Sequence, residues 1–69
     1  MPLTLAPVGT EMIVRRVGGS AEVRQHLSDM GFVAGGAVTV VAEMGSNLIV
    51  RVKESRVALS REVAAKIIV

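Results

Sequence analysis

The residue with the widest chemical repertoire in this 69-residue sequence is its only histidine, His26. Glu22 lies four residues before it and Asp29 three residues after it, spacings that place the side chains on one side of a helix. An imidazole with two carboxylates can hold a divalent cation, but sites that retain a metal recruit ligands from several elements. The sequence offers no cysteine, so we expect no cofactor and no dedicated metal site, with weak or shared divalent metal binding as the alternative.

Catalytic constellations are equally scarce. The five serines would have to share one histidine, and none lies in a recognisable nucleophile motif. The six acidic residues fall in predicted turns, at strand ends or on the polar side of the predicted helix. Acid-base catalysis needs carboxyl groups in a perturbed, partly buried environment. We therefore expect that the protein is not an enzyme.

Glycines and basic residues do not form a phosphate or nucleic-acid motif. The seven glycines match neither GxGxxG nor a Walker A pattern, so we interpret them as turn residues. The formal charge is only +2, and the two signs are interspersed. Six basic residues are candidates for a patch: Arg15, Arg16, Arg24, Arg51, Lys53 and Arg56. Single-strand binding also uses aromatic platforms, which the predicted sheet lacks, so we expect no nucleic-acid partner, with a nucleic-acid-binding small barrel left open as an alternative.

The first predicted element is a strand over residues 11–17. Apolar and β-branched residues fill this segment, and glycines bound it on both sides. Arg15 and Arg16 interrupt the alternation. The pattern therefore leaves open which face of this strand is buried.

A helix is predicted from Ala21 to about Met30. Ser20 is a good N-cap, and an acidic residue follows in the first turn, where the helix dipole favours negative charge. Steps of about 100° per residue gather one apolar stripe, formed by Val23, Leu27 and Met30. Gly31 fits the left-handed position of a Schellman ending, which would return Phe32 against Leu27.

The rest of the chain predicts further short strands. Residues 37–43 alternate, with Val38, Val40 and Ala42 on one face. The later elements are strands over 48–53 and 56–59, a helical turn over 61–65 capped by Ser60, and a strand over 67–69. We expect one domain over residues 1–69. Its predicted fold is mainly β, a small bent barrel of about five strands, with one α-helix between strands one and two and a short helical turn before the last strand.

Nothing in the sequence predicts a membrane segment. The longest stretch without a charged residue or histidine covers residues 30–42, which is shorter than the about 20 apolar residues that span a bilayer. The first cationic residue is Arg15, so the N-terminus lacks the positive region of a secretory signal. We expect a cytoplasmic protein that does not insert into a membrane.

The surplus of apolar residues predicts a contact surface for a partner. Apolar residues make up 51% of the sequence, and the mean hydropathy is +0.56, more than so small a core can bury. Because Phe32 is assigned to the helix end, Val33 is the candidate for an outward apolar contact. Arg24 and His26 border the helical stripe and are candidates for a polar rim. We predict that Arg24, His26 and Val33 bind a protein partner.

Three stretches carry a family resemblance. Residues 24–38, RQHLSDMGFVAGGAV, show a basic residue, a Leu, two variable positions, Met-Gly and an apolar residue, then a turn and a strand. Residues 57–69 end a strand on Ala-Leu and close on Ile-Ile-Val after one helical turn, and Leu3, Leu5 and Gly9 form a Leu-rich entry. In this order and spacing, the chain resembles ferrous iron transport protein A, FeoA, over essentially its whole length. Ala34 departs from the Pro that the family commonly has, and the loop around Gly45 is shorter than in many members.

The resemblance implies an SH3-like barrel that serves as a small cytosolic accessory protein of ferrous iron uptake. Its implied partner is FeoB, the large membrane GTPase that transports ferrous iron, and the oligomeric state stays open. The same barrel forms the C-terminal module of iron-dependent repressors, so a regulatory module of that kind is the alternative. Against a stand-alone repressor, the sequence predicts no helix-turn-helix for reading DNA.

Overall fold

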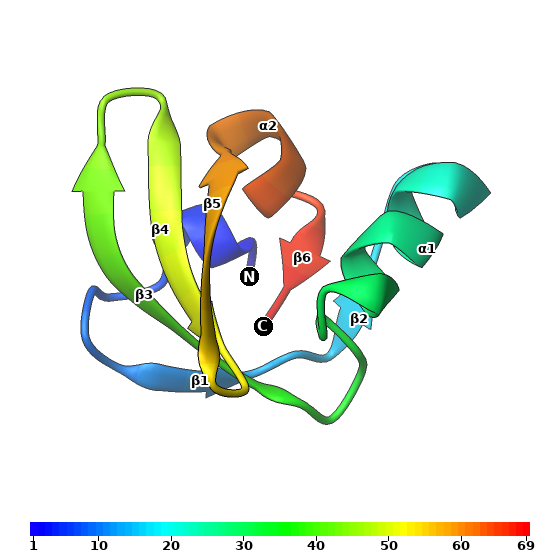
Figure 1. The fold of residues 1–69 in the computed structure, drawn as a ribbon, viewed down its shortest axis with the longest axis horizontal. Helices are drawn as coiled ribbons and strands as arrows, with labels where there is room; N and C mark the ends of the chain where they lie inside the picture. Colours follow the sequence, from blue (N-terminus) through cyan, green and yellow to red (C-terminus); the bar gives the residue numbers. More distant parts are fainter.

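The computed structural model describes residues 1–69 and contains two antiparallel sheets (Figure 1). The larger sheet has the strand order β1-β3-β4-β5 and consists of β1 (Glu11–Ile13), β3 (Ala37–Met44), β4 (Asn47–Val52) and β5 (Ser55–Ser60). The smaller sheet pairs β2 (Arg16–Val17) with β6 (Ile67–Ile68). The other elements are a 3-10 turn η1 (Leu3–Leu5) and the helices α1 (Ala21–Asp29) and α2 (Arg61–Ala64). The mainly β fold with these helix positions is confirmed, but β1 and β5 do not pair, so hydrogen bonds do not close the larger sheet into a barrel.

The prediction of one continuous strand over residues 11–17 is wrong. Its first part, β1, pairs with β3, whereas its last part, β2, pairs with β6. Between them Val14 is buried, and the Arg15 N–H donates to the carbonyl oxygen of Ile68 at 2.7 Å. The arginines that interrupt the alternation thus mark the point where the chain leaves one sheet for the other. The division of this segment gives the fold six strands, against the about five predicted for the same SH3-like architecture.

A register shift divides β3. Val38 and Val40 are buried and pair with core residues of β4, as predicted. β3 then contains one extra residue relative to β4, so that Ala42 pairs with Ile49. Ala42 and Ile49 therefore lie on the face of the sheet opposite to Val40 and Val50. The prediction that Ala42 shares the core face with Val38 and Val40 is wrong, because a β-bulge moves every following residue to the other face.

The core is one cluster of 14 buried apolar residues. The predicted alternation of β4 is confirmed, since Leu48, Val50 and Val52 all belong to this cluster. Leu3 of η1 is fully buried as well. This three-residue turn was not predicted, because so short an element has no periodic pattern.

The predicted ends of α1 are confirmed. The side chain of Ser20 caps its first turn. At its other end, the Phe32 N–H donates to the Leu27 carbonyl oxygen and the Gly31 N–H to that of Ser28, both at 2.9 Å. These are the two bonds of a Schellman motif. Leu27 and Phe32 are both buried, so the chain leaves the helix with its apolar face anchored in the core.

Gly31→Ala is expected to lower the free energy of unfolding by about 1–2 kcal/mol or more. Gly31 has a φ of 104°, and an added Cβ would lie 3.3 Å from Lys53 Cε and from Val52 Cγ2. Gly35→Ala is the matched control, because Gly35 has a φ of 87° but its Cβ would meet nothing within 4 Å. Urea denaturation of both variants measures the difference. Equal losses would show that the crowding at Gly31 contributes nothing.

The first residue of the short helix α2 contacts the β3–β4 hairpin. The side chain of Ser60 caps it, as predicted. The Arg61 N–H donates to the carbonyl oxygen of Ser46 at 3.0 Å, and the guanidinium lies 3.8 Å from the Glu43 carboxylate. Neither α1 nor α2 has the length and apolar character that a membrane-crossing helix requires.

Candidate docking surface

Val33 lies in the turn between α1 and β3. The Gly36 N–H donates to the Val33 carbonyl oxygen at 2.9 Å and closes this turn. Two further bonds join the turn to Val14, the residue after β1. The Gly35 N–H donates to the Val14 carbonyl oxygen at 2.8 Å, and the Val14 N–H donates to the Gly36 carbonyl oxygen at 2.9 Å. The Val33 side chain is 40% exposed, although its neighbour Phe32 is buried. The Val33 N–H also donates to the Gly31 carbonyl oxygen at 3.1 Å, so a backbone held by four hydrogen bonds presents Val33 to solvent.

Ile13 is a second exposed apolar residue near this turn, and the sequence reasoning missed it. It is the last residue of β1, is 53% exposed, and directly precedes Val14, which is bonded to the turn. The interrupted alternation of residues 11–17 does not indicate which face is buried, so the sequence does not predict that the Ile13 side chain is exposed. The cross-strand partner of Ile13 is Ala37, so its side chain lies on the face of the larger sheet that carries Glu11. We call Val33 and the exposed Ala34, which follow one another in the turn, the turn surface.

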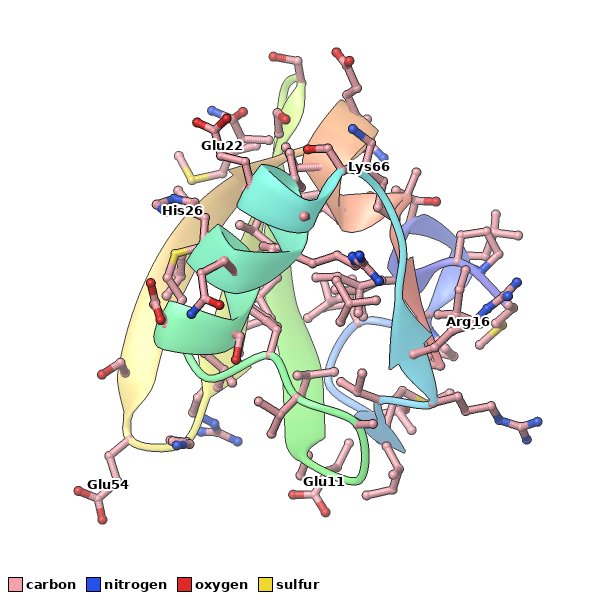
Figure 2. The ribbon with its side chains drawn as sticks, turned by 90° about the vertical axis from the view of Figure 1, so that its right-hand side faces the viewer. Glu11, Arg16, Glu22, His26, Glu54 and Lys66 are labelled. Atoms are coloured by element: carbon pink, nitrogen blue, oxygen red, sulfur yellow. The ribbon has the colours of Figure 1, made fainter.

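Arg24 and His26 lie on different sides of α1. Two residues along a helix correspond to about 200° around its axis. His26 and Glu22 extend from the same side of α1 in Figure 2, whereas Arg24 lines a shallow hollow with Ala21, Gln25 and Ser28. Both residues are exposed, and neither makes a side-chain hydrogen bond or an ion pair. The structure therefore does not join Arg24 and His26 into one rim.

No group of three His, Cys, Asp or Glu side chains lies close enough together to hold a metal ion. Helical spacing suggested one such group, formed by Glu22, His26 and Asp29. Their side chains do not lie close enough together to hold a metal ion. The turn surface itself carries no ionisable side chain. What it can do chemically is bury apolar side chains against another surface.

A second arrangement lies on the outer face of the larger sheet. Four consecutive cross-strand partners form a row across β1, β3, β4 and β5, namely Glu11, Thr39, Arg51 and Arg56. A hollow of about 250 Å³ opens beside this row and is lined by Glu11, Ala37, Thr39, Arg51 and Lys53. The sequence identified Arg51, Lys53 and Arg56 as basic, but their common face depends on strand register, which is a long-range property.

Solved structures with the same fold include two different kinds of protein. The crystal structure of Stenotrophomonas maltophilia FeoA in complex with zinc, described as a prokaryotic SH3 domain protein, has a TM-score of 0.87 and 30% identity over 99% of this chain and 87% of that one. A manganese-dependent transcriptional repressor has a TM-score of 0.86 and 17% identity over 97% of this chain and 39% of that one. At such low identity, the second likeness concerns the fold alone.

Sequence comparison identifies the family. The FeoA domain model matches residues 1–69. A protein of Methanocaldococcus jannaschii named as an Fe(2+) transport protein A is 32% identical over 68 residues, which cover 99% of this chain and 83% of the relative. The chain therefore belongs to the FeoA family of small SH3-like proteins associated with ferrous iron transport.

Proposed function

We propose that this protein is a cytoplasmic accessory protein of ferrous iron uptake that docks on the membrane GTPase FeoB and supports its activity. The observation that carries the proposal is the turn surface, where Val33 and Ala34 are exposed in a hydrogen-bonded turn. Covering exposed apolar side chains is the main favourable contribution in most protein association. Membership of the FeoA family supports a transport-related partner.

The turn surface is pre-organised for docking. The four backbone hydrogen bonds that fix residues 33–36 and Val14 leave little backbone freedom to lose on binding. Each Å² of apolar surface that a partner covers contributes about 25 cal/mol before the costs of association. Arg24 and His26 lie on separate flanks of α1, so each would border the contact on one side rather than form a shared rim.

Val33→Asp is expected to weaken binding to FeoB by about tenfold or more, because docking would have to desolvate a carboxylate. Ferrous iron uptake should fall with binding. The thermal midpoint should change little, since the side chain at this position is 40% exposed and can stay solvated in the free protein. Titration calorimetry with the detergent-solubilised transporter measures the affinity, and uptake of labelled ferrous iron by cells measures the activity.

Met44→Asp is the matched control for this variant. Met44 is also apolar and is 63% exposed, but it ends β3 at the hairpin tip, seven residues beyond Ala37, or about 23 Å at about 3.3 Å per residue. Its binding and uptake should equal those of the parent. Parent-like binding of Val33→Asp would place the docking site elsewhere, and equal losses in both variants would mean that any added negative charge weakens binding.

A further inference from the structure

β5 has an open edge. This strand, orange in Figure 1, is the last of the larger sheet and pairs only with β4. No residue from 55 to 59 takes part in a backbone hydrogen bond outside the β4–β5 ladder. The backbone groups on the other side of β5 are therefore free to pair with an additional strand.

Positive charges without partners lie next to this edge. Arg56 of β5 is directly opposite Arg51 of β4. Both are exposed, and neither makes a side-chain hydrogen bond or an ion pair. Like charges at directly opposed positions destabilise a sheet. The arrangement therefore costs free energy that a bound anionic group would recover.

A third positive charge extends the set. Lys53 follows β4 and lines the outer hollow together with Arg51. Its backbone has a φ of 55°, the only positive value in the chain outside glycine, and such a conformation is unfavourable for a residue with a side chain. We call Arg51, Lys53 and Arg56 the cationic row.

We propose that β5 accepts an extended segment of a partner protein as an added strand, with acidic side chains at alternate positions. Arg56 and Ala58 face outward, whereas Val57 and Leu59 face the core. Alternate residues of the added strand would share the outer face, so that their carboxylates lie beside Arg56 and within reach of Arg51. The residues between the acidic positions of the added strand would face the core side of the sheet and pack beside Val57. This mode of recognition combines main-chain hydrogen bonds with side-chain selection.

Charge decides which occupant fits the edge. A second copy of this chain would bring its own Arg56 to the same edge, and the repulsion disfavours self-pairing. A nucleic acid is negative too, but Glu11 lines the adjoining hollow, and the only aromatic residue, Phe32, is buried. Single-strand binders need exposed aromatic platforms. Discrete carboxylates on a peptide can instead contact the cationic row and avoid Glu11.

The test uses a probe that is independent of FeoB. An end-capped peptide of alternating Glu and Val is titrated into the isotope-labelled full chain, and amide shifts and hydrogen exchange are followed by NMR. We expect shifts confined to residues 47–60 and exchange of the open-edge amides of β5 slowed by about tenfold or more at saturation. A peptide of alternating Lys and Val should not bind. If the peptide does not bind, the proposed docking of FeoB at the turn surface still stands. If FeoB does not dock there, the proposed strand addition at β5 still stands.

Charge reversals separate binding from folding. Arg56→Glu should weaken peptide binding by about tenfold or more, because the attraction between Arg56 and a peptide carboxylate becomes a repulsion between two carboxylates. Arg51→Glu should also weaken binding. Either reversal should raise the thermal midpoint, since it converts the like-charge pair of Arg51 and Arg56 into an opposite-charge pair. Arg16→Glu is the control, because Arg16 is exposed on the smaller sheet (Figure 2) and should leave binding unchanged.

Four results would overturn the proposal. These are absence of peptide binding, equal binding of the lysine peptide, equal weakening by Arg16→Glu, and shifts without slower exchange in β5. Tighter binding of an oligothymidylate to the cationic row would assign the surface to nucleic acid instead. A concentration-dependent dimer that protects β5 would assign it to a second copy.

Discussion

Leu27→Ala is expected to lower the free energy of unfolding by about 2–5 kcal/mol. Leu27 is the only fully buried residue of α1, with 0% exposure, while Val23 and Met30 are only partly buried beside the same core. A nine-residue helix is not stable by itself, so its position depends on this anchor. Truncation would leave a cavity between α1 and the sheets that the neighbouring side chains can fill only in part.

Thermal and urea denaturation measure the Leu27→Ala effect. A domain of this size has a total stability of only about 5–10 kcal/mol, and its thermal midpoint moves by about 4–8 °C per kcal/mol. Ser28→Ala is the control, because Ser28 neighbours Leu27 on the exposed side of α1 and should change stability by less than about 0.5 kcal/mol. An unchanged midpoint for Leu27→Ala would mean that the assigned core face of the helix is wrong.

Phe32→Ala should be the most destabilising single truncation, at about 3–5 kcal/mol. Phe32 is the only aromatic residue, is 1% exposed, and heads the set of large fully buried side chains. Its N–H also closes the Schellman motif on Leu27. The side chain therefore joins the end of α1 to the turn that presents Val33, and its loss should loosen that turn together with the core.

Phe32→Leu distinguishes apolar packing from a general disturbance of the turn. A leucine keeps the backbone bonds and most of the buried volume, so its cost should be clearly smaller than that of Phe32→Ala. Urea denaturation of both variants provides the comparison. Nearly equal costs would show that the aromatic contacts do not stabilise the fold through packing volume.

The features that the sequence predicted well are those that depend on neighbouring residues. Ser20, Leu27, Gly31 and Phe32 all lie within 13 residues, and the caps and the apolar stripe of α1 follow from local geometry. The same holds for Ser60 at the start of α2. The outward position of Val33 follows from the assignment of Phe32 to the core.

The features that escaped prediction depend on distant residues. β1 and β2 separate because their partners, β3 and β6, come from different parts of the chain, and a local pattern contains no information about partners. The bulge in β3 that displaces Ala42 becomes visible only against β4. Ile13 and the Arg51–Arg56 pair were missed for the same reason, because register alone decides which side chains share a face.

Two surfaces of one small domain thus have distinct chemistry. The turn surface is apolar and follows α1, whereas the cationic row is positively charged and lies on β4, on β5 and in the turn between them. The family membership concerns ferrous iron transport, while the cationic row is argued from charge and strand pairing.

Hydrogen exchange of this chain with and without purified FeoB, followed by mass spectrometry, tests the docking on the transporter most directly. We predict slower exchange in peptides that cover residues 11–15 and 31–37, since a docked partner would cover the turn surface and its backbone. Exchange at the hairpin tip around Met44 should stay the same. Protection confined to that tip, or no protection anywhere at saturating FeoB, would contradict docking through the turn surface.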